Sequence, residues 1–262
     1  MERLDKELVN RKLAQNRTKA QELIVKGFVF VNNKQILKVS FGIGAQDNIE
    51  IKENNLFKYV SRGGFKLEKA LKVFKIKIKD QVVLDIGSST GGFTDCALQN
   101  GAKKVIAVDV GTDLMHKDLR QNKKVELYEN TNIALLDSKK FCEADIIVTD
   151  VSFVSLTKIF ESIVKVPKLF EIVCLIKPQF ECGKEIAKKY RGIILNEKIH
   201  RQILVNTIQM FNENNYFVKG LTFSPIKGGD GNIEYLAHLT TNQPNISLEI
   251  DKLVESAFGN KF

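Results

Sequence analysis

Residues 82–95 decide the fold, and they read Val-Val-Leu-Asp-Ile-Gly-Ser-Ser-Thr-Gly-Gly-Phe-Thr-Asp. The stretch opens with an apolar run that closes on Asp85, which is typical of a strand buried on both faces of a parallel sheet. A loop of tiny residues, 87–92, follows and leads into a helix-like segment, 93–98. Loop glycines let a ligand lie against the backbone, and parallel sheets bind ligands just beyond the carboxyl ends of their strands. The stretch therefore predicts a small-molecule site, and specifically a nucleoside site.

The kind of nucleoside follows from what surrounds this loop. No Gly-Lys-Ser/Thr follows it, as a phosphate-binding loop would require, and its glycine spacing differs from the dinucleotide fingerprint. A second apolar run, 104–109, ends on Asp109, where such sheets place the acid that binds a ribose. An acid before the loop, an acid after the next strand and no phosphate anchor favour S-adenosylmethionine over NAD or ATP. The alternative is an ordinary strand-loop-helix unit without a ligand.

The sequence after residue 82 alternates strands and helices, which predicts an α/β fold with a mostly parallel, doubly wound, Rossmann-like sheet. Three expected strands end on charged residues, Asp109, Asp150 and Lys177, at the sheet edge where such folds bind ligands. We expect the last two strands to pair as a hairpin at the sheet edge, after a long helix over 196–211. The expected strands are 82–86, 104–109, 125–128, 145–150, 172–176, 217–223 and 233–239.

The N-terminal residues 1–56 predict a small α+β domain of two helices and a hairpin. Asn16 is the expected N-cap of the second helix, over 17–26, and Asn32-Asn33 is the expected hairpin turn before a last strand, 48–51. We expect a linker over 57–62, a helix capped by Ser61, a second domain over 63–242, and a peripheral tail over 243–262 with a short helix.

Composition bounds the function. The 262 residues are 44% hydrophobic and 27% charged, as in a globular protein. A net charge of +9 favours a polyanionic partner such as nucleic acid or an anionic membrane surface. The sequence shows neither a signal peptide nor a membrane-spanning run, so we expect a cytoplasmic protein without a membrane partner. The four cysteines and three histidines lack metal-ligand spacing, so we expect no metal.

Five motifs, in order along the chain, carry a resemblance to a known family. They are Tyr-Val-Ser-Arg-Gly-Gly-Phe-Lys at 59–66, Asp-Ile-Gly-Ser-Ser-Thr-Gly-Gly-Phe-Thr at 85–94, Asp-Val-Ser-Phe-Val-Ser-Leu at 150–156, Lys-Pro-Gln-Phe-Glu at 177–181 and Gly-Asn-Ile-Glu-Tyr at 231–235. As an ordered set they resemble the TlyA family, ribosomal-RNA 2'-O-methyltransferases historically called haemolysins. The resemblance implies an FtsJ-type catalytic domain behind an alpha-L RNA-binding domain, the type that a small-subunit ribosomal protein and many pseudouridine synthases share.

The resemblance also implies functional residues. FtsJ-type enzymes carry a Lys-Asp-Lys-Glu tetrad, which falls here on Lys66, Asp150, Lys177 and Glu234. Such a cluster suits the reaction, because a lysine can assist loss of a proton from a ribose hydroxyl while carboxylates hold the lysines in place. The implied S-adenosylmethionine-binding residues are Asp85, Gly87, Ser88, Ser89, Thr90, Gly91, Gly92, Phe93, Asp109, Thr131, Asn132 and Asp150. The implied RNA-binding residues are Arg3, Lys6, Arg11, Lys12, Arg17, Lys19 and Arg62.

The implied activity is methylation of a cytidine ribose in 16S rRNA, 23S rRNA or both, within ribosomal subunits. Two alternatives remain: a non-enzymatic RNA-binding ribosome-assembly factor, and a membrane-active haemolysin. The chain departs from some relatives before the second domain, where Phe57 and Tyr59 stand in place of an arginine and a tryptophan. That departure bears on coupling between RNA binding and cofactor affinity rather than on the chemistry.

Overall fold

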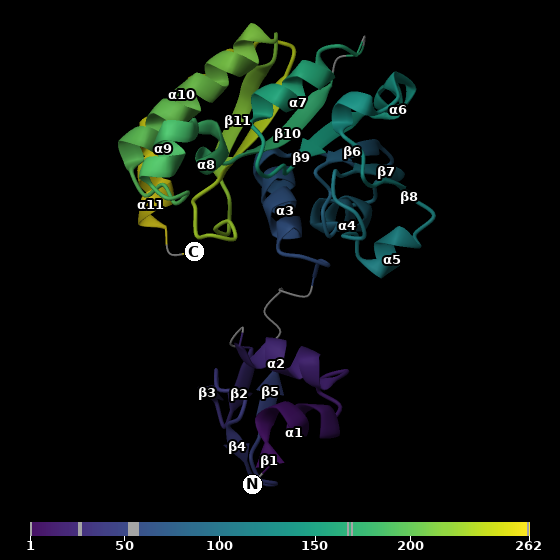
Figure 1. Ribbon diagram of the computed structural model, residues 1–262, viewed down its shortest axis with the longest axis vertical. Coiled ribbons are helices and arrows are strands. Elements are labelled where there is room, and N and C mark those ends of the chain that lie inside the picture. The colour runs from purple at the N-terminus through teal and green to yellow at the C-terminus, as the bar shows by residue number, and fades with distance from the viewer. Residues whose placement is uncertain (1, 26–27, 52–57, 167, 169, 261) are drawn as a thin grey trace. The chain divides into compact units, whose positions relative to one another are not determined.

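A computed structural model describes residues 2–25, 28–51, 58–166, 168, 170–260 and 262 (Figure 1). The chain divides into two compact units, with the boundary between Lys58 and Tyr59. Phe57, part of the departure noted above, lies outside the described residues.

The N-terminal unit packs two helices against short strands around a core that includes Leu4, Leu8 and Ile24. The elements are β1 (Glu2–Arg3), α1 (Leu4–Asn10), α2 (Arg17–Val25), β2 (Val29–Val31), β3 (Lys34–Gln35), β4 (Gly42–Ile43) and β5 (Ile49–Ile51). The expected cap is confirmed, because Asn16 Oδ1 accepts a hydrogen bond from the Lys19 amide at 2.9 Å. The hairpin is confirmed as well, with Asn32 and Asn33 both at positive φ between β2 and β3. The pairing of β1 with β4 was not expected.

The C-terminal unit is built on a seven-stranded sheet in the order β11-β12-β10-β9-β6-β7-β8. Its strands are β6 (Val82–Ile86), β7 (Lys104–Val108), β8 (Val125–Tyr128), β9 (Ile146–Thr149), β10 (Glu171–Ile176), β11 (Phe217–Phe223) and β12 (Tyr235–Thr240). The five strands β6 to β10 run parallel, and β12 lies antiparallel between β10 and β11. The predicted Rossmann-like sheet and edge hairpin are thus confirmed. The strand order reverses between β6 and β9, which is where such sheets bind ligands.

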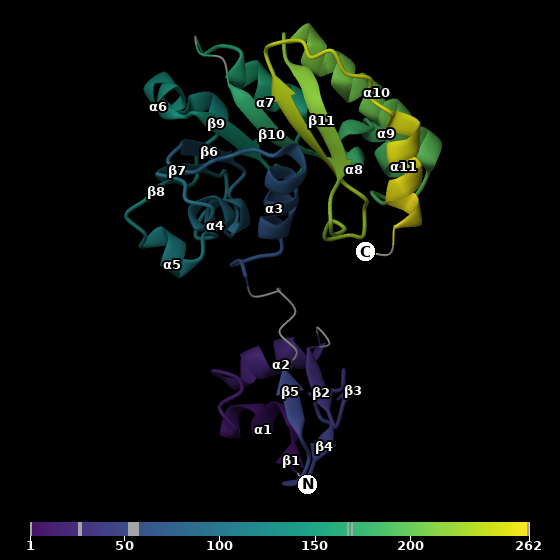
Figure 2. The same cartoon turned by 180° about the vertical axis from the view of Figure 1, so that it is seen from behind.

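Helices cover both faces of this sheet (Figures 1 and 2). On one face α3 (Gly63–Phe74) and α4 (Gly92–Gln99) pack against alternate residues of the central strands, such as Val83 and Val105. On the other face α7 (Leu156–Ile163), α10 (Glu197–Glu213) and α11 (Ile250–Gly259) contribute buried residues to a second core, which also includes Leu84 and Ile106. The shorter elements are α5 (Lys117–Arg120), a 3₁₀ helix (Ile133–Leu135), α6 (Ser138–Glu143), α8 (Pro178–Glu181) and α9 (Lys184–Lys189).

Three local expectations change. Tyr59 is buried in the core beneath α3, and the Val60 amide donates to Asp95 at 2.7 Å, so the compact unit begins before the expected linker ends. Ser61 does not cap α3; Arg62 occupies the cap position and no side chain caps the helix. The expected peripheral tail contributes α11, whose Val254 and Ala257 are fully buried in the core. Among the described residues, no helix is long and apolar enough to cross a bilayer.

Candidate active site

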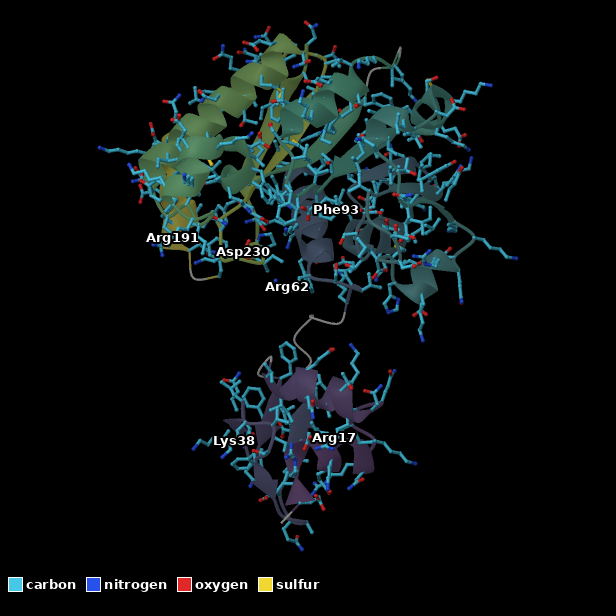
Figure 3. The ribbon with its side chains drawn as sticks, viewed as in Figure 1. Arg17, Lys38, Arg62, Phe93, Arg191 and Asp230 are labelled. Atoms are coloured by element: carbon cyan, nitrogen blue, oxygen red, sulfur yellow. The ribbon has the colours of Figure 1, made fainter. Side chains whose placement is uncertain are left out.

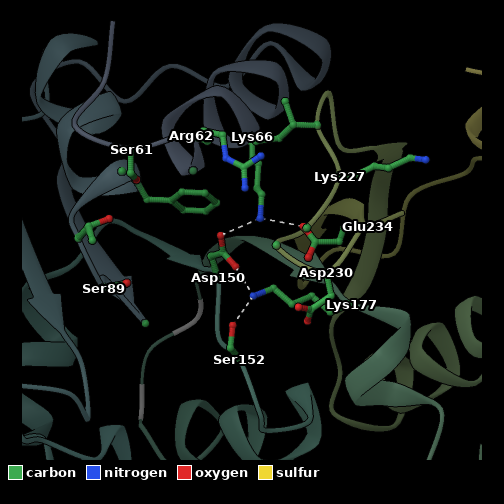
Figure 4. A pocket seen from close by; sticks show the side chains of 18 of the residues that line it. Ser61, Arg62, Lys66, Ser89, Asp150, Ser152, Lys177, Lys227, Asp230 and Glu234 are labelled. Carbon is green, nitrogen blue, oxygen red and sulfur yellow. Dashed lines mark hydrogen bonds and ion pairs between the residues drawn. The ribbon is translucent and has the colours of Figure 1, made fainter. Parts of the chain in front are cut away.

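Four charged side chains from distant parts of the chain meet at the carboxyl edge of the sheet (Figure 4). Asp150 follows β9 and Lys177 follows β10, so both leave parallel strands at the same edge. Glu234 precedes β12, which is antiparallel and therefore starts at that edge, and Lys66 reaches it from α3. The structure thus brings all four implied catalytic residues together. We call these four residues the Lys-Asp-Lys-Glu cluster.

Ion pairs connect the cluster in a chain. Asp150 uses one oxygen for each lysine: Oδ1 lies 2.6 Å from Lys177 Nζ and Oδ2 lies 3.3 Å from Lys66 Nζ. Lys66 Nζ also lies 2.7 Å from Glu234 Oε2. Every side chain in the cluster is at most 16% exposed. Buried charges persist when they are paired, and two lysines with two carboxylates form a balanced set.

Lys66 is held as a cation. Burial lowers the pKa of Lys66, but the carboxylates of Asp150 and Glu234 outweigh that effect, so its pKa lies above the ordinary lysine value. A lysine in this state cannot take a proton from a substrate. It instead neutralises two buried carboxylates and leaves Lys177 as the lysine that contacts only one of them.

A pocket of about 400 Å³ opens over the cluster. Its wall includes the start of α3, the glycine loop after β6, the residues after β9 and β10, and the loop over 226–230. Figure 3 labels three residues that line the pocket, Arg62, Phe93 and Asp230. The pocket therefore combines the glycine loop with the Lys-Asp-Lys-Glu cluster in one site.

Close packing explains two glycines of the loop. Gly87 has φ +83°, and a Cβ there would lie 2.9 Å from the Asp150 carbonyl oxygen. A Cβ on Gly92 would lie 2.4 Å from Ser61 Oγ and 2.9 Å from the Gly64 amide nitrogen. These glycines let the loop lie against the end of β9 and let α4 begin against α3, which encloses the pocket.

The implied cofactor residues fall into two groups. Seven of them line the pocket: Gly87, Ser88, Ser89, Thr90, Gly92, Phe93 and Asp150. The lining does not include Asp85, Gly91, Asp109, Thr131 or Asn132. Asp109 lies beside the loop all the same, because its carboxylate accepts from the Ser89 amide at 2.8 Å, and its carbonyl accepts from the Thr131 amide at 2.9 Å. Asn132 caps the 3₁₀ helix that follows.

The loop also carries buried polar atoms without partners. Asp85 lies fully buried beneath it, and Thr94 Oγ1 donates to Asp85 Oδ2 at 2.6 Å. Within the described ranges, Asp85 Oδ1 and Ser88 Oγ are buried and have no hydrogen-bond partner. Burial raises the pKa of Asp85 to about 7. Because buried polar groups are nearly always hydrogen-bonded, these atoms fit a site that a polar ligand completes. No group of metal-ligating side chains occurs among the described residues.

Comparisons with known proteins identify this arrangement. Residues 59–241 match the FtsJ-like methyltransferase model and residues 2–49 match the S4 domain model. Hemolysin A of Brachyspira hyodysenteriae is 43% identical over 239 residues, covering 90% of this chain and 98% of that protein. The 16S/23S rRNA (cytidine-2'-O)-methyltransferase TlyA of Mycobacterium tuberculosis is 33% identical over 241 residues, covering 91% and 90%. The chain belongs to the TlyA family.

A solved structure supports the same assignment. A candidate haemolysin from Streptococcus thermophilus superposes with a TM-score of 0.76 at 39% identity, covering 98% of this chain and 96% of that one. The TlyA family combines an S4 RNA-binding domain with an FtsJ-like methyltransferase domain. The N-terminal unit of this chain is therefore the S4 domain, and the C-terminal unit is the methyltransferase domain.

Among the pocket residues of this TlyA-family site that sequence reasoning missed are Ser152, Phe153 and Phe180. Lys177 Nζ donates to Ser152 Oγ at 2.7 Å. Phe153 is 92% exposed and has φ +66°, and its ring centroid lies 5.3 Å from that of Phe180. All three lie inside quoted motifs, 150–156 and 177–181, which is the signal that could have found them. Motif residues other than the charged ones thus contribute to the site.

The last motif, 231–235, is explained by anchoring of Glu234 on both sides. Asn232 is fully buried; its side chain donates to the Gly192 carbonyl at 2.8 Å and accepts from the Ile194 amide at 2.9 Å. The Tyr235 hydroxyl lies 2.8 Å from His200 Nδ1, and His200 Nε2 lies 2.8 Å from the Ile194 carbonyl. A carbonyl only accepts, so Nε2 donates and Nδ1 accepts from Tyr235. These bonds fix the strand start that carries Glu234.

In the S4 domain, two of the implied RNA-binding residues share one buried carboxylate. Arg3 Nε lies 2.9 Å from Asp5 Oδ1, and Arg17 Nε lies 2.7 Å from Asp5 Oδ2. The Arg3 hydrogen bond, against the effect of burial, holds the pKa of Asp5 far below its usual value. Both arginines remain about half exposed, with guanidinium nitrogens left for a ligand (Figure 3 labels Arg17). Sequence reasoning did not single out Asp5.

The other implied RNA-binding residues differ from one another. Arg11 donates to the Asp47 carbonyl at 2.7 Å and pairs with Glu7 at 2.8 Å, so it holds the S4 domain together. Lys6 and Lys19 form exposed pairs with Glu2 and Glu22. Lys12 is exposed and forms no ion pair within the described part of the chain. Arg62 lines the pocket of the methyltransferase domain instead.

Proposed function

We propose that this protein is an S-adenosylmethionine-dependent rRNA methyltransferase that methylates the 2'-hydroxyl of a cytidine ribose. The single observation that carries the proposal is the buried Lys-Asp-Lys-Glu cluster at the floor of a pocket walled by the glycine loop. A methyl-transfer site needs a cofactor cradle beside groups that orient a hydroxyl and accept its proton. The cytidine target rests on the names of the Campylobacter jejuni and Mycobacterium tuberculosis relatives, which act on 23S and on 16S and 23S rRNA.

The residues divide the chemistry among them. S-adenosylmethionine supplies an activated methyl group on a sulfonium, and the residues of the glycine loop, 87–93, would hold it with Asp109 and Asp85. Lys177 accepts the proton of the 2'-hydroxyl as the oxygen forms its bond to the methyl carbon. Lys66 stays protonated and holds Asp150 and Glu234 in place. The fixed charge of Lys66 also stabilises negative charge that develops on the oxygen.

The substrate side of the pocket offers an aromatic surface. Phe153 and Phe180 line the pocket mouth, and Phe153 is almost fully exposed. A nucleotide whose ribose reaches Lys177 must leave its stack, and an exposed phenyl ring supplies a replacement stacking partner. Affinity for the RNA backbone comes from the S4 domain, where Asp5 orients Arg3 and Arg17 toward phosphates.

The test is transfer of labelled methyl groups to ribosomal subunits. Purified protein is incubated with radiolabelled S-adenosylmethionine and, separately, with small and large subunits from a strain that lacks the activity. We expect label in rRNA that maps to an alkali-resistant dinucleotide containing cytidine. Cofactor binding without label in either subunit or in naked rRNA would reject the enzyme assignment and favour an RNA-binding assembly factor. Label on a base would also reject it, because the modified atom would not be the ribose oxygen.

A further inference from the structure

We propose that Ser152 is a positioning residue for the reaction, because it fixes the direction in which Lys177 presents its amine. The inference rests on the proposed function and deepens it. Lys177 Nζ lies 2.7 Å from Ser152 Oγ and 2.6 Å from Asp150 Oδ1, and the lysine side chain is only 7% exposed. Ser152 stands outside the Lys-Asp-Lys-Glu cluster, yet it lines the same pocket.

The geometry of an amine limits where its hydrogens and its lone pair can point. Besides its bond to Cε, the nitrogen has three tetrahedral positions, and one N–H group held on a fixed acceptor stops rotation about the Cε–Nζ bond and sets the direction of the other two. Asp150 Oδ1 attracts the amine as an ion pair, but within the described residues it accepts no hydrogen bond. Ser152 Oγ accepts a hydrogen bond from Lys177 Nζ at 2.7 Å and therefore sets these directions, and Figure 4 shows the amine between the two oxygens.

The reaction needs one of these positions for a lone pair. When Lys177 is neutral, one N–H group points to Ser152 and the lone pair occupies another of the tetrahedral positions. The proton of the 2'-hydroxyl moves to that lone pair as the oxygen–methyl bond forms and the sulfur–methyl bond breaks, its electron pair going to sulfur. The resulting ammonium keeps its hydrogen bond to Ser152 and its ion pair with Asp150. Ser152 thus aims the lone pair without contacting the reacting atoms.

The loop backbone explains why Ser152 faces Lys177. The next residue, Phe153, has φ +66°, which bulky residues rarely adopt and which persists only when surrounding contacts require it. This left-handed turn follows Ser152 directly and leaves Phe153 92% exposed. Ser152 is itself an exposed residue, yet its hydroxyl contacts the buried amine of Lys177.

Contacts on the far side of the loop hold it in this position. Glu181, on α8, accepts hydrogen bonds from Ser155 Oγ at 2.6 Å and from the Leu156 amide at 2.9 Å. Phe180, its neighbour on α8, contacts Phe153. The residues after β9 and the residues after β10 are thus joined at Lys177, at Phe180 and at Glu181. These contacts hold the loop that carries Ser152 beside Lys177.

The kinetic experiment compares Ser152→Ala with Ser152→Thr, which keeps the hydroxyl, and with Thr157→Ala, which removes a nearby hydroxyl that contacts Ser155 rather than Lys177. We expect Ser152→Ala to lower kcat about tenfold to a hundredfold, with KM for cofactor and for RNA unchanged, as for a misplaced reactive group. Ser152→Thr restores kcat to within a few-fold, and Thr157→Ala retains it. An unchanged kcat in Ser152→Ala, or a loss that Ser152→Thr fails to restore, would overturn the proposal.

A second readout does not depend on methyl transfer. Nuclear magnetic resonance of ¹⁵Nζ-labelled lysines, with Lys177→Arg for assignment, reports on rotation and proton exchange of the Lys177 amine in the ligand-free protein. We expect a restrained Lys177 signal in wild type and Ser152→Thr, and faster rotation and exchange in Ser152→Ala. Equal signals in all three proteins would contradict the role of Ser152. If wild type shows the restrained signal but methylates no RNA, the proposed function fails while Ser152 still positions the amine.

Discussion

Lys66 Nζ lies 2.7 Å from Glu234 Oε2, and this ion pair joins helix α3 to the start of strand β12. Glu234 reaches the pocket only because β12 inserts antiparallel between β10 and β11. The hairpin of β11 and β12 therefore forms one edge of the sheet and also completes the Lys-Asp-Lys-Glu cluster. Methyl transfer should require this hairpin to be paired with β10.

Removal of Lys66 should destabilise the protein, because its two carboxylate partners are buried. We expect Lys66→Met to lower the free energy of unfolding by about 3 kcal/mol, because Asp150 and Glu234 then lose the cation between them. Urea denaturation at neutral pH measures the change. Lys72→Met, an exposed lysine on the same helix, is the control and should leave stability within about 0.5 kcal/mol. The double variant with Glu234→Gln should recover part of the loss; no recovery would show that the pair is not the cause.

Asp85 should lower the stability of the folded protein at neutral pH while it contributes to cofactor binding. Its pKa is raised by burial to about 7 in the folded protein, against 3.8 for the free side chain. The folded state thus binds the proton more tightly than the unfolded chain, so stability falls as pH rises between these two values. Asp85→Asn should therefore be more stable than wild type at pH 8 and no more stable at pH 3.5. We expect the same variant to bind S-adenosylmethionine more weakly, measured by calorimetry; a stabilised variant with undiminished cofactor affinity would assign Asp85 a packing role only.

His200 should contribute the opposite pH dependence. Burial lowers its pKa below the ordinary value of 6.5, and its Nδ1 must stay unprotonated to accept from Tyr235. The unfolded chain then binds the proton at higher pH than the folded chain, so this stability is complete above pH 6.5 and is lost as pH falls below it. Thermal unfolding between pH 7.5 and 5 should show a smaller decline in His200→Gln than in wild type. Equal declines would mean that other groups dominate.

Arg17 and Arg11 should separate RNA affinity from stability. Arg17 contacts Asp5 through Nε and, within the described residues, has guanidinium nitrogens left for a ligand. Arg11 instead donates to backbone carbonyls and pairs with Glu7. We expect Arg17→Gln to weaken rRNA binding and to reduce the slope of log affinity against log salt by about 1. The fall in melting temperature should be smaller than for Arg11→Gln, because Arg3 and Gln21 still donate hydrogen bonds to Asp5. Arg11→Gln should lower the melting temperature more than it lowers the affinity for rRNA. Filter binding over a salt series measures the affinities, and thermal unfolding measures the melting temperatures. A larger loss of affinity in Arg11→Gln than in Arg17→Gln would contradict these assignments.

Phe153 should show a conflict between stability and activity. Phe153→Gly removes the backbone strain of a positive φ and should stabilise the protein by about 1 kcal/mol. The same change removes the exposed ring at the pocket mouth, so we expect kcat/KM for RNA to fall while cofactor affinity stays unchanged. A variant that is more stable and equally active would show that the ring has no role in holding the nucleotide.

Much of the fold was predictable because its signals are local. The apolar run before Asp85 and the asparagine pair of the N-terminal hairpin act over a few residues, and both expectations were confirmed. The expected linker over 57–62 differed because burial of Tyr59 beneath α3 is a tertiary effect. Expected strands also ended within a residue or two of the observed ones.

The site was predictable in its charges but not in its connections. Motif matching supplied the four charged residues, yet only the fold shows that Asp150 divides its oxygens between two lysines. Ser152 is a common residue without a charge, and nothing in its sequence position reveals contact with Lys177. A charge pattern also does not show that Arg11 holds the S4 domain together. Arg11 does so by donating to backbone carbonyls, which every residue has and which therefore give no sequence signal.

The most direct test of the account is single-turnover methylation of rRNA by Lys177→Ala, with cofactor and RNA binding measured on the same preparation. We predict that methyl transfer falls by at least about a hundredfold, because the amine that accepts the ribose proton is missing, while the protein stays folded and both binding constants remain near the wild-type values. Methyl transfer at the wild-type rate in Lys177→Ala would contradict the central claim and remove Lys177 from the chemistry.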